Sequence, residues 1–106
     1  MSKSKAAAEH RKLKKLLLQV GPACDGSLSE VFQKCGKPSC RCHKGKRYRH
    51  GPYYLWTRKV DGKTVTRKVL AAEAGQCREW IANNHRLNEI IRRMRALTWE
   101  APLSNE

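Results

Sequence analysis

A cluster of cysteines and a histidine in the middle of the chain places the tightest constraint on its fold. Residues 35–50 read CGKPSCRCHKGKRYRH, with Cys35, Cys40 and Cys42 spaced C-x4-C-x-C and His50 eight residues further on. Thiolates and imidazoles are the ligands of structural zinc sites, and close spacing on a turn lets several of them reach one ion. We therefore predict that these four side chains bind Zn²⁺. A structural zinc contributes on the order of 10–16 kcal/mol of apparent binding free energy, which offsets the small core of a 106-residue chain.

The fourth ligand has two rivals to His50. His43 is adjacent to Cys42, so its side chain points in a different direction and sharing one tetrahedral ion would strain the turn. Cys24 would complete a set of four thiolates. We rank His50 first, Cys24 second and His43 third. Alternatives to zinc are reduced thiols, some of them redox-active, an iron–sulfur centre or a disulfide, although an odd number of five cysteines argues against a complete disulfide framework.

The charge of the chain indicates a polyanionic partner. Lys and Arg number 23 against nine Asp and Glu, which gives a net charge of +14. Such a field attracts nucleic acid first and anionic membrane surfaces second. The charge is uneven, because residues 34–49 carry seven basic side chains and no acidic one, whereas residues 71–106 carry five of each. The basic run surrounds the predicted metal site, so we expect it to form the binding surface.

The predicted nucleic-acid contacts come from this run and from the strands that follow it. Lys and Arg side chains supply the sequence-independent phosphate contacts, and Tyr48, Tyr53, Tyr54 and Trp56 are near enough to stack on bases, although aromatic residues at the start of a strand more often pack in a core. The predicted contact residues are Lys34, Lys37, Arg41, Lys44, Lys46, Arg47, Arg49, Arg58, Lys59, Lys63, Arg67 and Lys68.

The hydrophobic pattern predicts an α+β fold. Apolar side chains at helical spacing predict a basic helix over Ala6–Val20 and a long amphipathic helix over Ala72–Leu97. Ser27 and Glu30 form a capping-box pattern that predicts a short helix, which Gly36 and Pro38 end.

Between the cluster and the long helix, β-prone segments on either side of Asp61-Gly62 predict a hairpin over residues 53–70. Its two faces each mix apolar and basic side chains, so the pattern leaves the buried face open. We divide the chain into a basic N-terminal helix (1–22), a zinc-knuckle, hairpin and helix domain (23–100) and a flexible tail (101–106).

Enzymatic functions are disfavoured. The nine carboxylates form no obvious pair for acid–base or two-metal chemistry, and the chain has no phosphate-binding glycine-rich loop. A closed four-ligand zinc site is structural, since catalysis needs an open position. No apolar run is long enough to span a bilayer and no signal peptide is visible, so we expect a cytoplasmic protein with no membrane partner.

The run from Gly26-Ser27-Leu28 through C35-G-K-P-S-C40-R-C42 to H50-G-P-Y-Y resembles a family of small, functionally uncharacterised bacterial and archaeal domains. These domains share a C-G-K-P-x-C-x-C…H-G-P-Y core followed by a basic hairpin and a leucine-rich helix. The resemblance covers roughly residues 26–97. Because such domains often lie beside transposase or integrase genes, it implies an accessory protein of a mobile element and supports Cys35, Cys40, Cys42 and His50 as one unit.

We therefore expect a non-catalytic nucleic-acid-binding protein, with DNA favoured over RNA, that serves a transposase, a recombinase or another larger protein. The C-terminal helix is expected to join that partner or a second copy of the chain. The alternatives are an RNA-binding module and an adaptor whose basic surface binds an acidic or larger protein.

Overall fold

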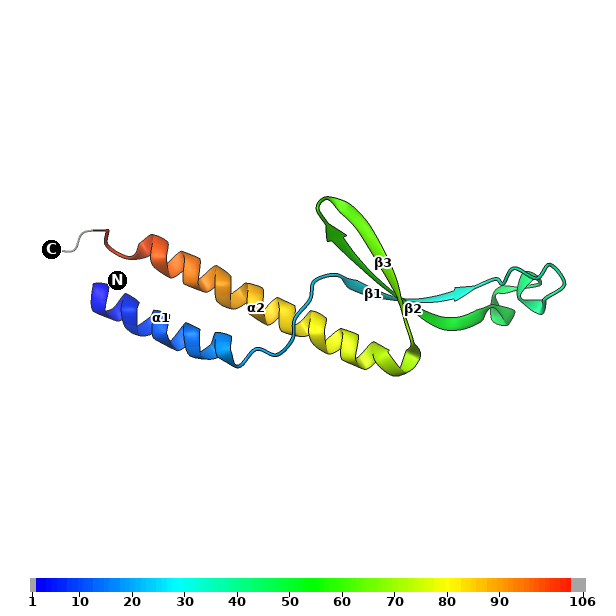
Figure 1. Ribbon diagram of the computed structural model, residues 1–106, viewed down its shortest axis with the longest axis horizontal. Helices are drawn as coiled ribbons and strands as arrows, with labels where there is room; N and C mark the ends of the chain where they lie inside the picture. Colours follow the sequence, from blue (N-terminus) through cyan, green and yellow to red (C-terminus); the bar gives the residue numbers. More distant parts are fainter. Residues whose placement is uncertain (1, 104–106) are drawn as a thin grey trace. The chain divides into compact units, whose positions relative to one another are not determined.

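The computed structural model describes residues 2–103 and confirms the α+β class. The described residues form two α-helices and a three-stranded antiparallel sheet with strand order β1-β2-β3; Figure 1 shows their arrangement along the chain. Single turns of 3₁₀-helix lie at residues 41–43, 46–48 and 71–73. The elements are α1 (Lys3–Leu18), β1 (Ser27–Gln33), β2 (His50–Val60), β3 (Lys63–Val69) and α2 (Ala74–Glu100).

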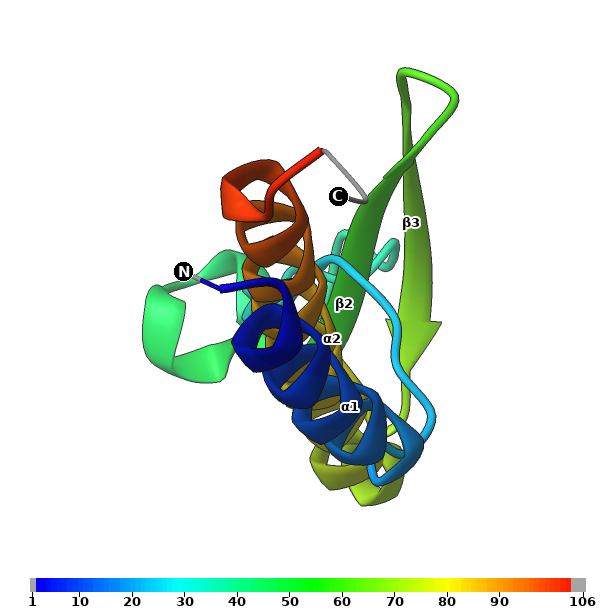
Figure 2. The ribbon, with the colours of Figure 1, turned by 90° about the vertical axis from the view of Figure 1, so that its left-hand side faces the viewer.

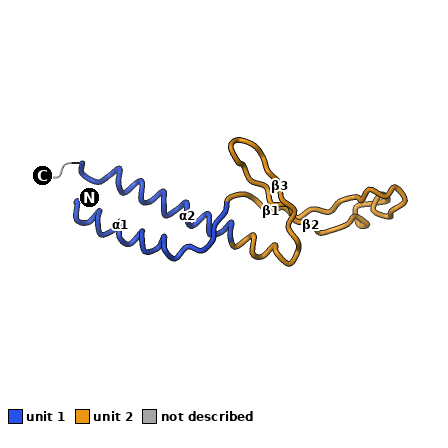
Figure 3. Tube along the Cα trace, viewed as in Figure 1, with its two compact units in different colours: residues 1–24, 80–106 blue, residues 25–79 orange. Residues whose placement is uncertain are grey.

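The chain forms two compact units, coloured separately in Figure 3. The helical unit comprises residues 1–24 and 80–106, and the sheet unit comprises residues 25–79. Helix α2 therefore begins in the sheet unit and continues in the helical unit. Residues 104–106 of the predicted flexible tail lie outside the described residues.

Helix α1 begins three residues before its predicted start. The Ser2 side chain accepts a hydrogen bond from the Lys5 backbone N–H at 3.2 Å and so caps the helix. Ala6, in the first turn, is buried at 7% exposure. A serine cap and one small buried side chain thus extend the helix through a lysine-rich segment that has little apolar pattern of its own.

Helices α1 and α2 pack side by side in the helical unit, as Figure 2 shows from the end of the pair. Their contact is a stripe of apolar side chains from both helices, with partly buried neighbours around it. The buried members of this core are Ala6, Leu13, Ile90 and Leu97. Asn83 is also buried, and its Nδ2 donates to the Pro22 carbonyl at 2.9 Å, which fixes the segment that leaves α1.

The predicted short helix from Ser27 is wrong, because this segment is strand β1. Leu28 pairs with Trp56 and Val31 pairs with Tyr53 in antiparallel register with β2. The capping-box pattern is present, but a helix of about two turns is unstable by itself in water. Pairing with β2 gives partners to the backbone groups along the edge of the segment that faces β2, while the other edge of β1 stays at the border of the sheet. It also places Leu28 and Val31 on opposite faces instead of on one helical stripe.

The predicted hairpin is confirmed. Strand β2 ends at Val60 and β3 begins at Lys63, so Asp61 and Gly62 form a two-residue turn. Their φ angles are 52° and 80°, the positive values that hairpin turns of this length require and that Asp-Gly tolerates. The turn places Val60 opposite Lys63 and Trp56 opposite Arg67.

The structure also decides which face of the sheet is buried. Trp56 and Val69, at 8% and 6% exposure, lie on one face, which we call the Trp56 face. The indole N–H of Trp56 donates to the Asp25 carbonyl at 3.0 Å, and the Arg78 guanidinium lies 5.5 Å from the ring centroid of Tyr54. The opposite face, the Tyr53 face, contains no buried side chain among Ser27, Ser29, Val31, Tyr53, Leu55, Thr57, Lys59, Thr64, Thr66 and Lys68.

Candidate metal centre

The register of the sheet brings the two ends of the cysteine segment together. Gln33, the last residue of β1, pairs with His50, the first residue of β2. Cys35 lies two residues beyond Gln33, so it must lie close to His50. The glycine that follows His50 is constrained in turn, because Gly51 has φ 143° and a Cβ there would lie 2.8 Å from the Val31 carbonyl oxygen.

Two 3₁₀ turns fold the connecting loop back onto this point. The Cys40 N–H donates to the Lys37 carbonyl at 3.1 Å, and the His43 N–H donates to the Cys40 carbonyl at 3.2 Å. The first turn (Arg41–His43) contains Cys42, which is fully buried. The Cys35 N–H donates to Cys42 Sγ at 3.2 Å, so the backbone already supplies a hydrogen bond to one sulfur.

The four predicted ligand side chains lie together. One sulfur or nitrogen atom from each of Cys35, Cys40, Cys42 and His50 lies within 4.8 Å of all the others. Cys40 Sγ is 3.2 Å from His50 Nε2, and Cys42 Sγ is 3.5 Å from Cys35 Sγ. A Zn–S bond of about 2.3 Å in a tetrahedron separates two sulfurs by roughly 3.8 Å. The residues therefore fit a tetrahedral ion with three sulfurs and one nitrogen.

The surroundings of the thiols differ in polarity. Hydrogen bonds, first from the Cys42 backbone and then with the His50 side chain, lower the pKa of Cys40 from 9.0 to about 6. Burial raises the pKa of Cys42 above its ordinary value of 9.0. None of the three clustered cysteines forms a disulfide. A hollow lined by Cys35, Gly36, Lys37, Cys40, His50 and Tyr53 opens beside the cluster, so Cys35, Cys40 and His50 are reachable from outside, whereas Cys42 is fully buried.

The two rival ligands lie outside this group. His43 turns away, and its Nε2 lies 3.1 Å from the Cys35 carbonyl oxygen. Cys24 belongs to the helical unit, where its backbone N–H donates to the Trp80 carbonyl at 3.2 Å. Cys77 also lies outside the group, buried at 2% exposure near the start of α2.

The predicted nucleic-acid contact residues are exposed, except for Arg49, which is half-buried. The Nε of Arg49 is a buried donor with no hydrogen-bond partner among residues 2–103. On the hairpin, Lys59 and Lys68 lie on the Tyr53 face, whereas Arg58, Lys63 and Arg67 lie on the Trp56 face. The hairpin cations therefore point in two directions and do not form one surface.

Several contacts of these cations had no signal in the sequence. Arg58 Nε lies 2.6 Å from the Asp25 carboxylate, so its charge is partly compensated by a residue 33 positions away. Tyr48 lies beneath both Arg41 and Arg47, whose guanidinium carbons are 4.5 and 4.7 Å from its ring centroid. The Lys68 ammonium lies 4.2 Å from the ring centroid of Tyr53. Such pairings depend on strand register and loop folding, which spacing alone does not give.

Within residues 2–103, no helix has the length and apolar character needed to cross a membrane. Comparison with curated proteins finds no match to the chain, and comparison with solved structures finds none either. A protein-family model does match residues 4–79. This segment includes α1 except for Lys3, the strands β1, β2 and β3, and the four clustered side chains. The prediction of an uncharacterised domain family is confirmed. The chain belongs to the family described as "Domain of unknown function (DUF6788)".

Proposed function

We propose that the chain is a zinc-stabilised, non-catalytic module that binds nucleic acid, with DNA as the favoured partner. One observation carries the proposal. Between Glu30 and Asp61 the chain has nine Lys and Arg residues and no acidic residue, and all nine except Arg49 are exposed. Six of the nine lie between Cys35 and His50, the segment that the Cys/His cluster ties together, and Lys34 directly precedes it. An exposed loop that has basic but no acidic side chains, and that a bound metal holds in one conformation, is suited to phosphate contacts.

The donor set supports zinc as the metal. Three thiols and one imidazole favour Zn²⁺ over the harder ions that carboxylates bind. With four protein ligands the ion has no open position, so it supplies folding free energy and no reaction chemistry. Cys35, Cys40, Cys42 and His50 would hold it.

The loop has little else to fold around. Cys42 is the only buried side chain between residues 34 and 49. Ordering a residue costs roughly 1–2 kcal/mol of backbone entropy, which this segment cannot recover from apolar burial. A bound metal would offset that cost before nucleic acid arrives, so the basic side chains would bind without a second ordering step.

The Tyr53 face offers the best continuation of this surface. It has three strands of exposed or half-exposed side chains, among them Lys59 and Lys68, and no acidic residue. The Trp56 face instead carries Glu30 and the ion pair between Arg58 and Asp25. Phosphates would therefore meet uncompensated positive charge on the Tyr53 face.

A role beside a transposase or recombinase rests on the family resemblance of the motif, and DNA is preferred over RNA on the same ground. Two competing functions make different predictions. An RNA-binding module would retain its binding when duplex DNA is added as a competitor. An adaptor for an acidic protein would show negligible nucleic-acid binding at physiological salt.

The first test combines metal content with binding to duplex DNA. We expect one zinc per chain and an affinity for a fluorescent duplex that falls steeply as salt rises, since each neutralised phosphate releases counterions. The double charge-reversal variant Lys37→Glu with Lys44→Glu should reduce the slope of log affinity against log salt by about two to four. A matched variant in the helical unit, Lys12→Glu with Arg93→Glu, controls for net charge.

Equal losses in both double variants would contradict a localised surface. A folded protein with no metal would contradict the zinc assignment, and activity that depends on oxidants would then favour a redox sensor. Competition between equimolar RNA and DNA duplexes separates the proposed DNA-binding function from the RNA-binding alternative.

A further inference from the structure

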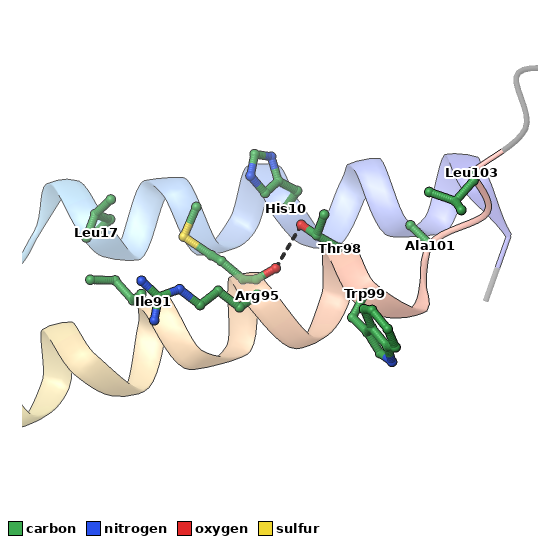
Figure 4. Close-up of a pocket in the computed structure, with 9 residues that line it drawn as sticks. His10, Leu17, Ile91, Arg95, Thr98, Trp99, Ala101 and Leu103 are labelled. Atoms are coloured by element: carbon green, nitrogen blue, oxygen red, sulfur yellow. Dashed lines mark hydrogen bonds between the residues drawn. The ribbon is translucent and has the colours of Figure 1, made fainter.

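The helical unit carries an apolar groove that neither the metal centre nor the basic loop uses. The groove lies between α1 and α2 and has a volume of about 850 Å³. Figure 4 shows the side chains that line it. Its walls are mainly apolar side chains from both helices and from the segment after α2, with a few polar ones among them. The lining residues are His10, Leu17, Ile91, Met94, Arg95, Thr98, Trp99, Ala101 and Leu103.

The groove exists because two helices cannot cover each other completely. Leu13, Ile90 and Leu97 face the shared core and are at most 9% exposed. A second set of side chains on each helix, which includes Leu17 on α1 and Ile91 on α2, then lies beside this core and lines the groove. At its rim, Trp99 and Leu103 are 90% and 100% exposed. Exposed tryptophan next to an apolar groove is typical of an interaction surface.

The charged side chains at the groove are positive. His10 and Arg95 are the titratable side chains among its lining residues, and none of the lining residues is acidic. Lys14 lies one turn from both His10 and Leu17, so it adds positive charge on that side of α1. The Thr98 hydroxyl donates to the Met94 carbonyl at 3.0 Å, so its own helix already satisfies it.

A second groove on the same pair of helices is different. Its lining contains Lys5 and Arg93 together with Glu9 and Glu100, so cations and carboxylates are mixed there. The positive rim is therefore a property of one side of the helix pair and does not simply follow from the net charge of the chain.

We propose that this groove binds an amphipathic α-helix of a partner protein, with apolar side chains on one face and acidic side chains flanking that face. Ile91 and Ala101 are ten residues apart on and just after α2, which corresponds to about 15 Å or three helical turns. A helix of that length presents anchors at i, i+3, i+4 and i+7, the spacing that helix-in-groove complexes use. Acidic flanks complement Lys14 and Arg95.

Charge also argues against a second copy as the occupant. Two chains that meet through this groove would bring two copies of Lys14 and two of Arg95 together, with no carboxylate among the described lining residues to separate them. Like charges at an interface cost free energy and disfavour that pairing.

The test uses the full chain and a fluorescein-labelled synthetic peptide of about 14 residues, helical in design. The peptide has leucines at i, i+3, i+4 and i+7 and glutamates beside them, and a matched peptide has lysines in place of the glutamates. By fluorescence anisotropy at about 150 mM salt, the acidic peptide should bind roughly tenfold more tightly than the basic one. Saturation should shift the Trp99 emission to shorter wavelength, and the Trp99→Phe variant should lose that shift.

The charge-reversal variant Arg95→Glu should reduce the ratio of the two affinities to about one or below. The matched variant Arg93→Glu, on the mixed-charge groove, should leave the ratio unchanged. Equal binding of both peptides, or binding of neither, overturns the proposal. So does a dimer by sedimentation that Arg95→Glu strengthens, because that result assigns the groove to a second copy. Loss of nucleic-acid binding or of zinc has no bearing on these outcomes.

Discussion

The Nε2 atom of His50 lies 3.2 Å from the Sγ atom of Cys40, although ten residues separate them in the chain. His50 opens β2 and pairs with Gln33 at the end of β1, while Cys40 precedes a 3₁₀ turn in the loop between the two strands. The sheet and the loop thus meet at one point. A metal bound there would link the sheet register to the basic loop.

His50 and His43 should respond differently to substitution. His50→Ala removes a proposed ligand and should weaken zinc binding by roughly 100-fold or more. His43→Ala removes a contact with the Cys35 carbonyl and should retain the metal. Competition with a chromophoric zinc chelator measures both affinities. Equal losses in the two variants would contradict the assignment of His50.

Metal removal should act locally. In the zinc-loaded protein, a chelator should expose backbone amides of residues 34–50 to hydrogen exchange, because Cys42 is the only buried side chain in that loop. Amides around Leu13, Ile90 and Leu97 should stay protected, since their core contains no ligand. Exchange followed by mass spectrometry compares the two regions. A uniform loss of protection would show instead that metal and helical core unfold together.

The two faces of the hairpin should contribute unequally to DNA binding. The double variant Lys59→Gln with Lys68→Gln alters the Tyr53 face and should lower the salt slope by about two. The variant Lys63→Gln with Arg67→Gln removes the same charge from the Trp56 face and should change the slope little. Salt-titrated anisotropy compares them. The opposite order would mean that the Trp56 face is the one that meets the phosphates.

Two leucines of α1 should differ strongly in their effect on stability. Leu13 is 4% exposed in the helical core, so Leu13→Ala should cost about 2–5 kcal/mol through lost burial and a cavity. Leu18 is 87% exposed, and Leu18→Ala should change the free energy of unfolding by less than about 0.5 kcal/mol. Denaturant unfolding followed by circular dichroism gives both values. Similar values would mean that Leu13 does not pack as the structure shows.

Local chemistry accounts for the features that the sequence predicted correctly. The Asp61-Gly62 turn depends on backbone angles that few residue pairs adopt, so two letters identify it. The long apolar stripe of α2 repeats over enough turns to be unambiguous. The short spacing of Cys35, Cys40 and Cys42 confines their side chains to one loop, and His50 follows directly.

Segment 27–33 shows where local signals fail. The capping pattern of Ser27 and Glu30 favours a helix start, and nothing within the segment shows that β2 has an open edge beside it. The strand forms because pairing with β2, which follows the whole cysteine loop in the chain, satisfies the backbone groups along one edge of the segment. The start of α1 was missed for a smaller reason, since one serine cap and the burial of Ala6 extend it.

The sequence by itself thus determined the α+β class, the hairpin turn, the two long helices and the four side chains that cluster. Only the tertiary structure decided that Ser27–Gln33 is a strand, that Trp56 and not Tyr53 faces the core of the sheet unit, and that Asp25 compensates Arg58. The physical reason is the distance along the chain over which each kind of interaction acts. Turns, caps and helical stripes are set by residues within a few positions of each other, whereas strand register, the choice of buried face and ion pairs between distant segments depend on contacts that exist only after the chain has folded.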